Sequence, residues 1–210
     1  KRGTGKVYRS EFLKANAFII GELNVNDHTF CMIVSEFPFD GLISLTMFKD
    51  KQITIDFGNK VLSIESEKSL EKLIANKDFE IPLQISNDRD INIDISMKII
   101  LDDHLPLNVV LDSGAGFNVY RFNSRYMKNL GIDSTQVKKI YKPSYFKPEA
   151  GNNFFITQVS KLSDAARNVT INDFRGIFIE GLIYEGIMSV NWIGEKFTID
   201  IPNKRIIVLK

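Results

Sequence analysis

The chain has 210 residues, 44% of them hydrophobic, and its formal net charge is +1. This length and apolar content suffice for a core in one domain or two small lobes, which excludes an intrinsically disordered chain. Acidic and basic residues are interspersed and nearly balanced, so we expect neither a nucleic acid nor an anionic membrane surface as a partner.

Most of the sequence predicts short β-strands, so the expected fold class is all-β with few short helices. The predicted strands are rich in Ile, Val and Phe and are separated by Gly, Asn, Asp and Pro. In chain order they cover residues 18–25, 30–37, 51–65, 90–100, 107–112, 153–159, 173–180 and 195–209.

Two segments predict helices instead. Residues 66–77 place Leu70, Leu73 and Ile74 on one helical face with charged residues around them. Residues 123–131 begin with a polar residue and end at a glycine, which is typical of a short capped helix. The composition of the first segment also marks it as a connector between two halves of the chain.

Cysteine, histidine and acidic residues give no metal or disulfide pattern. Cys31 is the only cysteine, and its apolar surroundings favour a buried packing role over a reactive thiol. His28 and His104 form no cluster resembling a zinc site. Residues 87–94 are rich in oxygen ligands for calcium, but their alternating Ile residues fit a half-exposed strand better.

No membrane span or signal peptide is predicted. No apolar run approaches the roughly 18 residues that a spanning helix needs. The chain starts at Lys1 rather than Met, so we expect that something upstream was removed or omitted. The lack of cysteine pairs fits a bacterial protein, for which the periplasm, cell envelope or medium is preferred.

The sequence contains an internal repeat. Residues 39–48 align with residues 184–193 at an offset of 145, and residues 53–60 with 197–204 at an offset of 144. At an offset of 146, residues 23–27 align with 169–173. A repeat with an all-β pattern predicts two lobes of the same topology, related by a pseudo-twofold axis and facing each other across a cleft.

These alignments predict the division of the chain. Residues 1–65 form an incomplete N-terminal lobe, residues 66–87 a linker, and residues 88–210 the C-terminal lobe. The cleft between two such lobes is a natural binding site.

The segment LNVVLDSGAG, residues 107–116, carries the candidate chemistry. An apolar strand leads into Asp112 and then into the small residues Ser113, Gly114 and Ala115. A lone Asp-Ser/Thr-Gly triplet arises by chance in about one chain in ten of this length. Asp112 is therefore either a catalytic acid at a strand end or the first residue of a turn.

The context of this triplet resembles the retropepsin-like aspartic proteases, particularly their bacterial two-lobed members. The matching elements are Asp112-Ser-Gly-Ala115, Glu185-Gly-Ile-Met-Ser189 and, in the first half, Asp40-Gly-Leu-Ile-Ser44. Ser44 and Ser189 replace the glycine that is usual there. The resemblance covers most of residues 88–210 and part of residues 1–65.

The resemblance implies an aspartic endopeptidase that cleaves an extended polypeptide without a cofactor. Asp112 would be one catalytic carboxylate, with Ser113, Gly114 and Ala115 supporting the active-site loop. Two carboxylates close together share one proton: one activates a water and the other, protonated, polarises the scissile carbonyl.

Flap residues follow from the resemblance and the repeat together. At an offset of 146, Gly5 matches Gly151 and Tyr8 matches Phe154. We expect Gly5 and Tyr8 in the flap of the first lobe, with Gly5 near its hairpin tip, and Gly151 and Phe154 in the flap of the second lobe, where all four would bind substrate.

The second catalytic aspartate is expected outside this sequence. Moving Asp112 back by 146 residues gives about position −34, and no second Asp-Ser/Thr-Gly occurs in the chain. Asp40, Asp56 and Asp200 are expected to be structural. We favour a cleaved precursor, with its N-terminal fragment as a partner, or a truncated product over a descendant that lost the first aspartate.

Two alternatives stay open. The first alternative to the protease is a non-catalytic peptide-binding module of the same fold. The second is an unrelated β-barrel or β-sandwich interaction protein. In the latter, Asp112 only begins a turn and lies far from any cleft.

Overall fold

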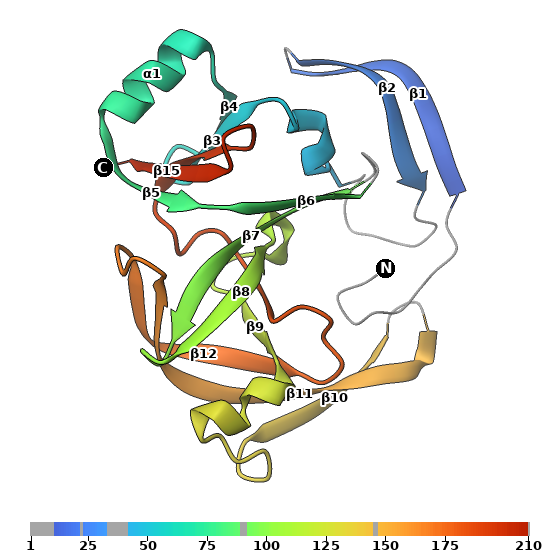
Figure 1. Ribbon diagram of the computed structural model, residues 1–210. Coiled ribbons are helices and arrows are strands. Elements are labelled where there is room, and N and C mark those ends of the chain that lie inside the picture. The colour runs from blue at the N-terminus through green and yellow to red at the C-terminus, as the bar shows by residue number, and fades with distance from the viewer. Residues whose placement is uncertain (1–10, 22, 33–41, 89–91, 145–146, 210) are drawn as a thin grey trace.

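The computed structural model describes residues 11–21, 23–32, 42–88, 92–144 and 147–209. Most of these residues lie in β-strands, which confirms the predicted all-β class (Figure 1). The first eight strands are β1 Glu11–Ile20, β2 Leu23–Met32, β3 Gln52–Asp56, β4 Val61–Ile64, β5 Lys77–Pro82, β6 Gln84–Asp88, β7 Asn92–Leu101 and β8 Leu105–Leu111. The others are β9 Tyr120–Asn123, β10 Lys138–Ser144, β11 Lys147–Asp164, β12 Thr170–Ile179, β13 Gly186–Met188, β14 Lys196–Asp200 and β15 Arg205–Leu209.

Helices are few and short, as expected. The only α-helix in the described ranges is α1, Glu67–Ala75, and it begins with a capping box between Ser66 and Ser69. The predicted helix at 123–131 is instead two 3₁₀ helices, with the predicted caps: the Asn123 side chain accepts from the Arg125 amide, and Gly131 is left-handed. The remaining 3₁₀ helices are η1 Leu45–Phe48 and η2 Ser113–Ala115, besides η3 Ser124–Tyr126 and η4 Lys128–Leu130.

An eight-stranded sheet forms the lower part of the molecule in Figure 1, in the order β10-β11-β12-β9-β13-β8-β7-β6. β11 also pairs with β7, so the sheet curls back on itself. Alternate residues of β7 and β8 are buried, which is the period-two pattern of strands with one face on a core. The short β13 lies between β8, to which it is parallel, and β9, to which it is antiparallel.

A separate five-stranded sheet joins the two ends of the chain. Its order is β4-β3-β14-β15-β5, so the C-terminal hairpin lies between strands from the first half and from the connector (Figure 1). Ile53, Phe197 and Ile206 are among its fully buried side chains. Helix α1 leads from β4 to β5 along the margin of this sheet.

The repeat is visible in the register of β3 and β14. Thr54 and Thr198 are equivalent at the offset of 144, and they lie directly opposite each other in the antiparallel pair. On either side, Ile53 pairs with Ile199 and Ile55 with Phe197, so each pair maps onto the other when the two strands exchange. The sheet therefore has a local pseudo-twofold axis that passes between the two threonines.

Backbone details repeat as well. Lys60 and Lys204, equivalent at 144, have φ of 57° and 53° in the turns that follow β3 and β14. Asp27 and Asp173, equivalent at 146, have φ of 52° and 51°. Left-handed backbone is uncommon for residues other than glycine, so its recurrence supports a shared topology for the repeated segments.

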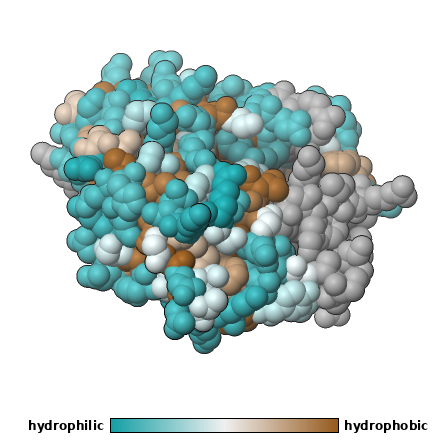
Figure 2. All heavy atoms as spheres, turned by 60° about the horizontal axis from the view of Figure 1, so that its bottom comes forward, coloured by the Kyte–Doolittle hydropathy of each residue, from teal (hydrophilic) through white to brown (hydrophobic). Residues whose placement is uncertain are grey.

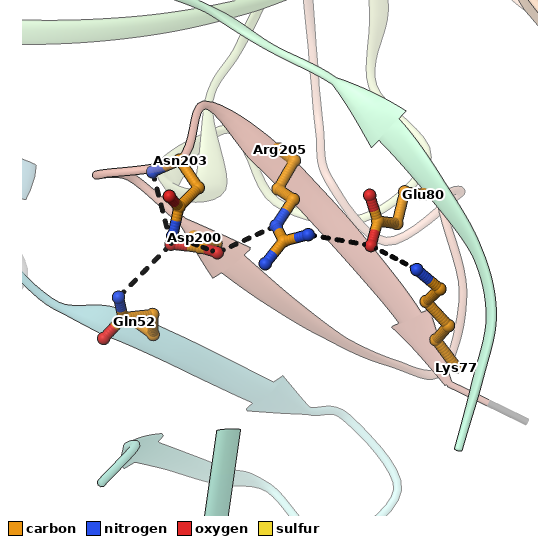
Figure 3. Close-up of polar contacts among 6 residues, drawn as sticks. All are labelled: Gln52, Lys77, Glu80, Asp200, Asn203 and Arg205. Carbon is orange, nitrogen blue, oxygen red and sulfur yellow. Dashed lines mark hydrogen bonds and ion pairs between the residues drawn. The ribbon is translucent and has the colours of Figure 1, made fainter. Parts of the chain in front are cut away.

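Asp200 is a structural residue of the five-stranded sheet (Figure 3). Its carboxylate is fully buried and accepts hydrogen bonds from Gln52, Asn203 and Arg205. Arg205 also forms an ion pair with Glu80, with 2.9 Å between Arg205 Nη1 and Glu80 Oε1. One polar network thus links β3, β14, β15 and β5.

The hairpin β1–β2 forms a two-stranded sheet of its own. Residues 18–25, predicted as one strand, instead include the turn of this hairpin, because Gly21 adopts a φ of 56°. The predicted burial of Cys31 is wrong: its side chain is exposed, since β2 has a partner only along its edge with β1 among the described residues.

The described surface is largely polar. On the face shown in Figure 2, hydrophilic residues predominate and hydrophobic residues gather toward the middle. Within the described ranges, no helix is long and apolar enough to cross a membrane. The same residues contain no group of three or more His, Cys, Asp or Glu side chains arranged to hold a metal ion.

Candidate active site

Asp112 follows the end of β8, an interior strand of the eight-stranded sheet. Leu107, Val109 and Leu111 are buried and fix the strand in the core. The Asp112 amide donates to the Met188 carbonyl at 2.8 Å, one residue beyond the parallel β8–β13 ladder. Asp112 is therefore held at the end of an interior strand, where the chain leaves the sheet.

The small residues after Asp112 form a tight turn around its carboxylate. Asp112 Oδ1 accepts from the Gly114 amide at 2.9 Å, and the Ala115 amide donates to the Asp112 carbonyl at 3.2 Å. A Cβ on Gly114 would lie 3.3 Å from Oδ1, which is a tight contact. Asp112 thus begins a turn, as one alternative predicted, and one of its oxygens orders that turn.

The return of the chain to β9 is braced by Ser189, which the sequence analysis named, and by a pair of asparagines, which it did not. Ser189 is fully buried, and its Oγ accepts from the Val119 amide at 3.0 Å. Asn118 and Asn191 bond each other through the Asn118 amide to Asn191 Oδ1, at 3.0 Å, and through Asn191 Nδ2 to Asn118 Oδ1, at 2.9 Å. Ser189 was recognisable from the sequence because it recurs as Ser44 in the repeat.

Glu185 and Gly186 explain why the Glu-Gly-Ile-Met-Ser segment packs beside the Asp112 strand. Glu185 accepts from the Asn108 amide and from the Tyr126 hydroxyl, both at 2.6 Å. Burial, reinforced by the bond to Glu185, raises the pKa of Tyr126 above its usual value. A Cβ on Gly186 would lie only 2.8 Å from a Val109 methyl carbon, so a side chain here would push β13 away from β8.

A cavity of about 950 Å³ borders the Asp112 loop. Leu111 and Ser113, on either side of Asp112, are among its lining residues. Asp112 itself is not among the described lining residues, and one of its carboxylate oxygens accepts from the Gly114 amide. The rest of the lining comes mainly from the first half of the chain and is largely apolar: Ile20, Gly21, Leu23, Ile43, Leu45, Phe48, Lys51, Ile53, Ile55, Leu62, Ser63, Ile64, Ile95, Val190 and Ile199.

This cavity lies beside the local pseudo-twofold axis. Ile53, Ile55 and Ile199 belong to the residue pairs that flank the Thr54–Thr198 axis, and all three line the cavity together with Ser113.

Two of the four predicted flap residues lie in the part of the chain that the structure describes. Gly5 and Tyr8 lie outside the described residues. Gly151 and Phe154 lie in β11, where they pair with Pro143 and Ile140 of β10. Neither is among the described lining of the cavity, and their role in substrate binding stays a prediction.

Gly151 has a clear packing reason in this hairpin. A Cβ there would collide with the Lys142 carbonyl oxygen and the Tyr141 ring. Only glycine lets the two strands approach this closely at that point.

Comparisons with known proteins find similarity among solved structures. No protein-family model matches the chain, and no curated protein matches its sequence. Among solved structures, a retropepsin-like aspartic protease from Rickettsia conorii is similar over 61% of this chain and 87% of its own, with a TM-score of 0.42 and 16% identity. This similarity assigns no role to individual residues of this chain.

Proposed function

We propose that the chain forms part of a retropepsin-like aspartic endopeptidase in which Asp112 is one of two catalytic carboxylates. The observation that carries the proposal is the position of the Asp112 loop, at the end of a buried strand and at the border of the 950 Å³ cavity beside the local pseudo-twofold axis. In this proposal, residues 1–65 and 88–210 belong to two lobes, and the five-stranded sheet lies at their junction.

The proposed chemistry needs a second carboxylate within a few ångströms of Asp112. Two carboxylates that close share one proton, because both cannot easily ionise. The ionised carboxylate takes a proton from water as that water adds to the scissile carbonyl, and the protonated one polarises the carbonyl oxygen. The tetrahedral intermediate then collapses, the C–N bond breaks, and the amine nitrogen takes up a proton.

The sheet edges and apolar walls fit an extended polypeptide as substrate. Such a strand is held by main-chain hydrogen bonds, while apolar pockets select its side chains. The cavity lining is dominated by Ile and Leu, so we expect apolar side chains at the cleavage site.

Peptide binding without hydrolysis is the second candidate. One observation favours it: no acidic side chain is among the described residues that line the cavity. Without a second carboxylate beside Asp112, the fold would bind a peptide and not cleave it.

The test compares cleavage of an unstructured protein substrate at mildly acid pH by the protein expressed from its full reading frame and by its Asp112→Asn variant. Asparagine keeps an oxygen that can accept from the Gly114 amide, so the turn should survive the change. We expect a loss of about 10³-fold or more in rate. Asp78→Asn, at an exposed position of β5, is the matched control and should keep full activity.

A further inference from the structure

One row of side chains crosses the whole eight-stranded sheet. Residues that pair in neighbouring strands point to the same face of a sheet, so the strand registers define the row. From the β10 edge to the β6 edge, the row consists of Lys138, Ile156, Ile177, Arg121, Ile187, Val110, Ser96 and Gln84.

This row lies on the face of the sheet that carries Asp112. Phe122 and Phe178, each one residue from a member of the row, are fully buried on the opposite face, against the core. Asp112 is two residues beyond Val110, and its backbone is still extended, with φ of −121° and ψ of 100°. Because side chains alternate along an extended chain, Asp112 points to the same face as the row.

Arg121 is a half-buried cation in the middle of this row. Its neighbours Ile177 and Ile187 are apolar and half-buried as well. Neither an ion pair nor a side-chain hydrogen bond joins Arg121 to any other residue that the structure describes. Glu185, two residues before Ile187, pairs with Arg125 instead, at 3.4 Å.

The chemistry of the row favours an anionic ligand at Arg121. The row contains no acidic residue. A guanidinium group that is partly removed from water and has no partner is costly, and a carboxylate can offset that cost through two parallel hydrogen bonds. Arg175, two residues before Ile177 in β12, is exposed and adds positive charge on the same face.

We infer that Arg121 is a specificity-determining residue, which binds the carboxylate of an Asp or Glu side chain in an extended polypeptide lying across the row. Strands β8 and β9 are two strand spacings apart, and Asp112 is one side-chain repeat beyond the row, so the Cα atoms of Arg121 and Asp112 lie about 12 Å apart. An extended chain covers this distance in about four residues. The acidic side chain therefore occupies one fixed position within about four residues of the cleaved bond.

This inference rests on the proposed function only for the location of the cleaved bond. The pairing of Arg121 with an acidic side chain requires binding and no hydrolysis. Binding and hydrolysis can therefore fail separately.

The test captures peptides before it cleaves them. The protein expressed from its full reading frame, carrying Asp112→Asn to prevent cleavage, is immobilised and mixed with a pool of synthetic peptides of random sequence, and bound peptides are sequenced by mass spectrometry. We expect Asp and Glu to be enriched about tenfold or more at one position relative to the apolar residues of the bound peptides. Arg121→Leu should abolish this enrichment, and Arg121→Glu should enrich Lys and Arg at the same position.

The matched control is Arg167→Leu, which removes an arginine from outside the row. Arg167 lies in an exposed turn, 3.9 Å from Asp103, and its variant should keep the enrichment of Asp and Glu. Capture of no peptide, absence of acidic enrichment in the parent, or the same enrichment with Arg121→Leu would overturn the inference. Acidic enrichment without cleavage of the same pool by the protein with Asp112 intact would instead refute only the proposed hydrolysis.

Discussion

Asp56 and Asp200 occupy equivalent positions in the repeat and have the same local partners. Each accepts hydrogen bonds from an asparagine three residues later, Asn59 or Asn203. Each also reaches across the axis, Asp56 to Lys196 and Asp200 to Gln52. The carboxylates of the two strands thus close equivalent turns and bond the facing strand, whereas Asp112 precedes a loop that borders a cavity.

The free energy of unfolding at acid pH should depend on Asp56. Hydrogen bonds from Asn59, followed by the contact with Lys196, lower the pKa of Asp56 from 3.8 to about 2. A lowered carboxyl pKa gives stability that is present above the ordinary pKa and is lost as pH falls through the folded-state value. The difference in free energy of unfolding between the parent and Asp56→Asn should therefore be constant above pH 5 and shrink between about pH 4 and 2.

Urea denaturation at each pH measures this difference. Asp78→Asn serves as the control, and its difference from the parent should stay the same across the range. A pH-independent difference for Asp56→Asn would contradict the role of these hydrogen bonds.

Gly186 is required by packing rather than by backbone conformation. A Cβ at this position meets Val109, the Arg121 carbonyl oxygen and the Phe122 ring within 2.8–3.1 Å. Gly186→Ala should cost about 1–3 kcal/mol of folding free energy, the usual range for overpacking a core. A change below about 0.5 kcal/mol in chemical denaturation would show that β13 is less tightly held between its neighbours.

At the scale of elements, the pair β3–β14 joins the two parts of the repeat. Thr54 and Thr198 are buried, and their hydroxyl oxygens lie 2.7 Å apart at the axis. Removing one hydroxyl leaves the other buried without this partner, whereas removing both leaves an apolar contact.

A double-mutant cycle tests this pair. Thr54→Val and Thr198→Val should each destabilise the protein by about 1–3 kcal/mol. The double variant should cost less than the sum of the two, with a coupling energy of at least about 1 kcal/mol. Additive effects would mean that the two hydroxyls act independently.

Local signals predicted many of the elements. The apolar face of Leu70, Leu73 and Ile74 predicted α1, and the alternation through residues 90–100 predicted β7. The strand across residues 18–25 was wrong because the glycine turn was read as part of an apolar run. Strands β5 and β10 were missed because their sequences mix Lys with apolar residues and lack a clear period.

The candidate site was predictable only in part. Asp112 and its small neighbours were recognisable because they follow an apolar strand. The Asn118–Asn191 pair was not, since a contact between residues 73 positions apart leaves no local pattern. The repeat predicted two related parts, but not that β14 and β15 would share one sheet with β3 and β5, because that pairing depends on the folded arrangement.

At the scale of the whole molecule, the two parts of the repeat are unequal. The second part contributes a sheet in which β13 lies between β8 and β9, while Ile20, Leu23 and Ile43 of the first part line a large apolar cavity. The Asp112 loop borders that cavity from the complete side.

The pH dependence of cleavage by the protein expressed from its full reading frame tests the central claim most directly. Two carboxylates that share one proton predict a bell-shaped profile of kcat/KM on the acid side of neutrality, with two apparent pKa values that belong to the pair. Asp112→Asn should lower kcat/KM by about 10³-fold or more across the whole profile. Cleavage by the Asp112→Asn variant with the parent's rate and profile would contradict the catalytic assignment of Asp112.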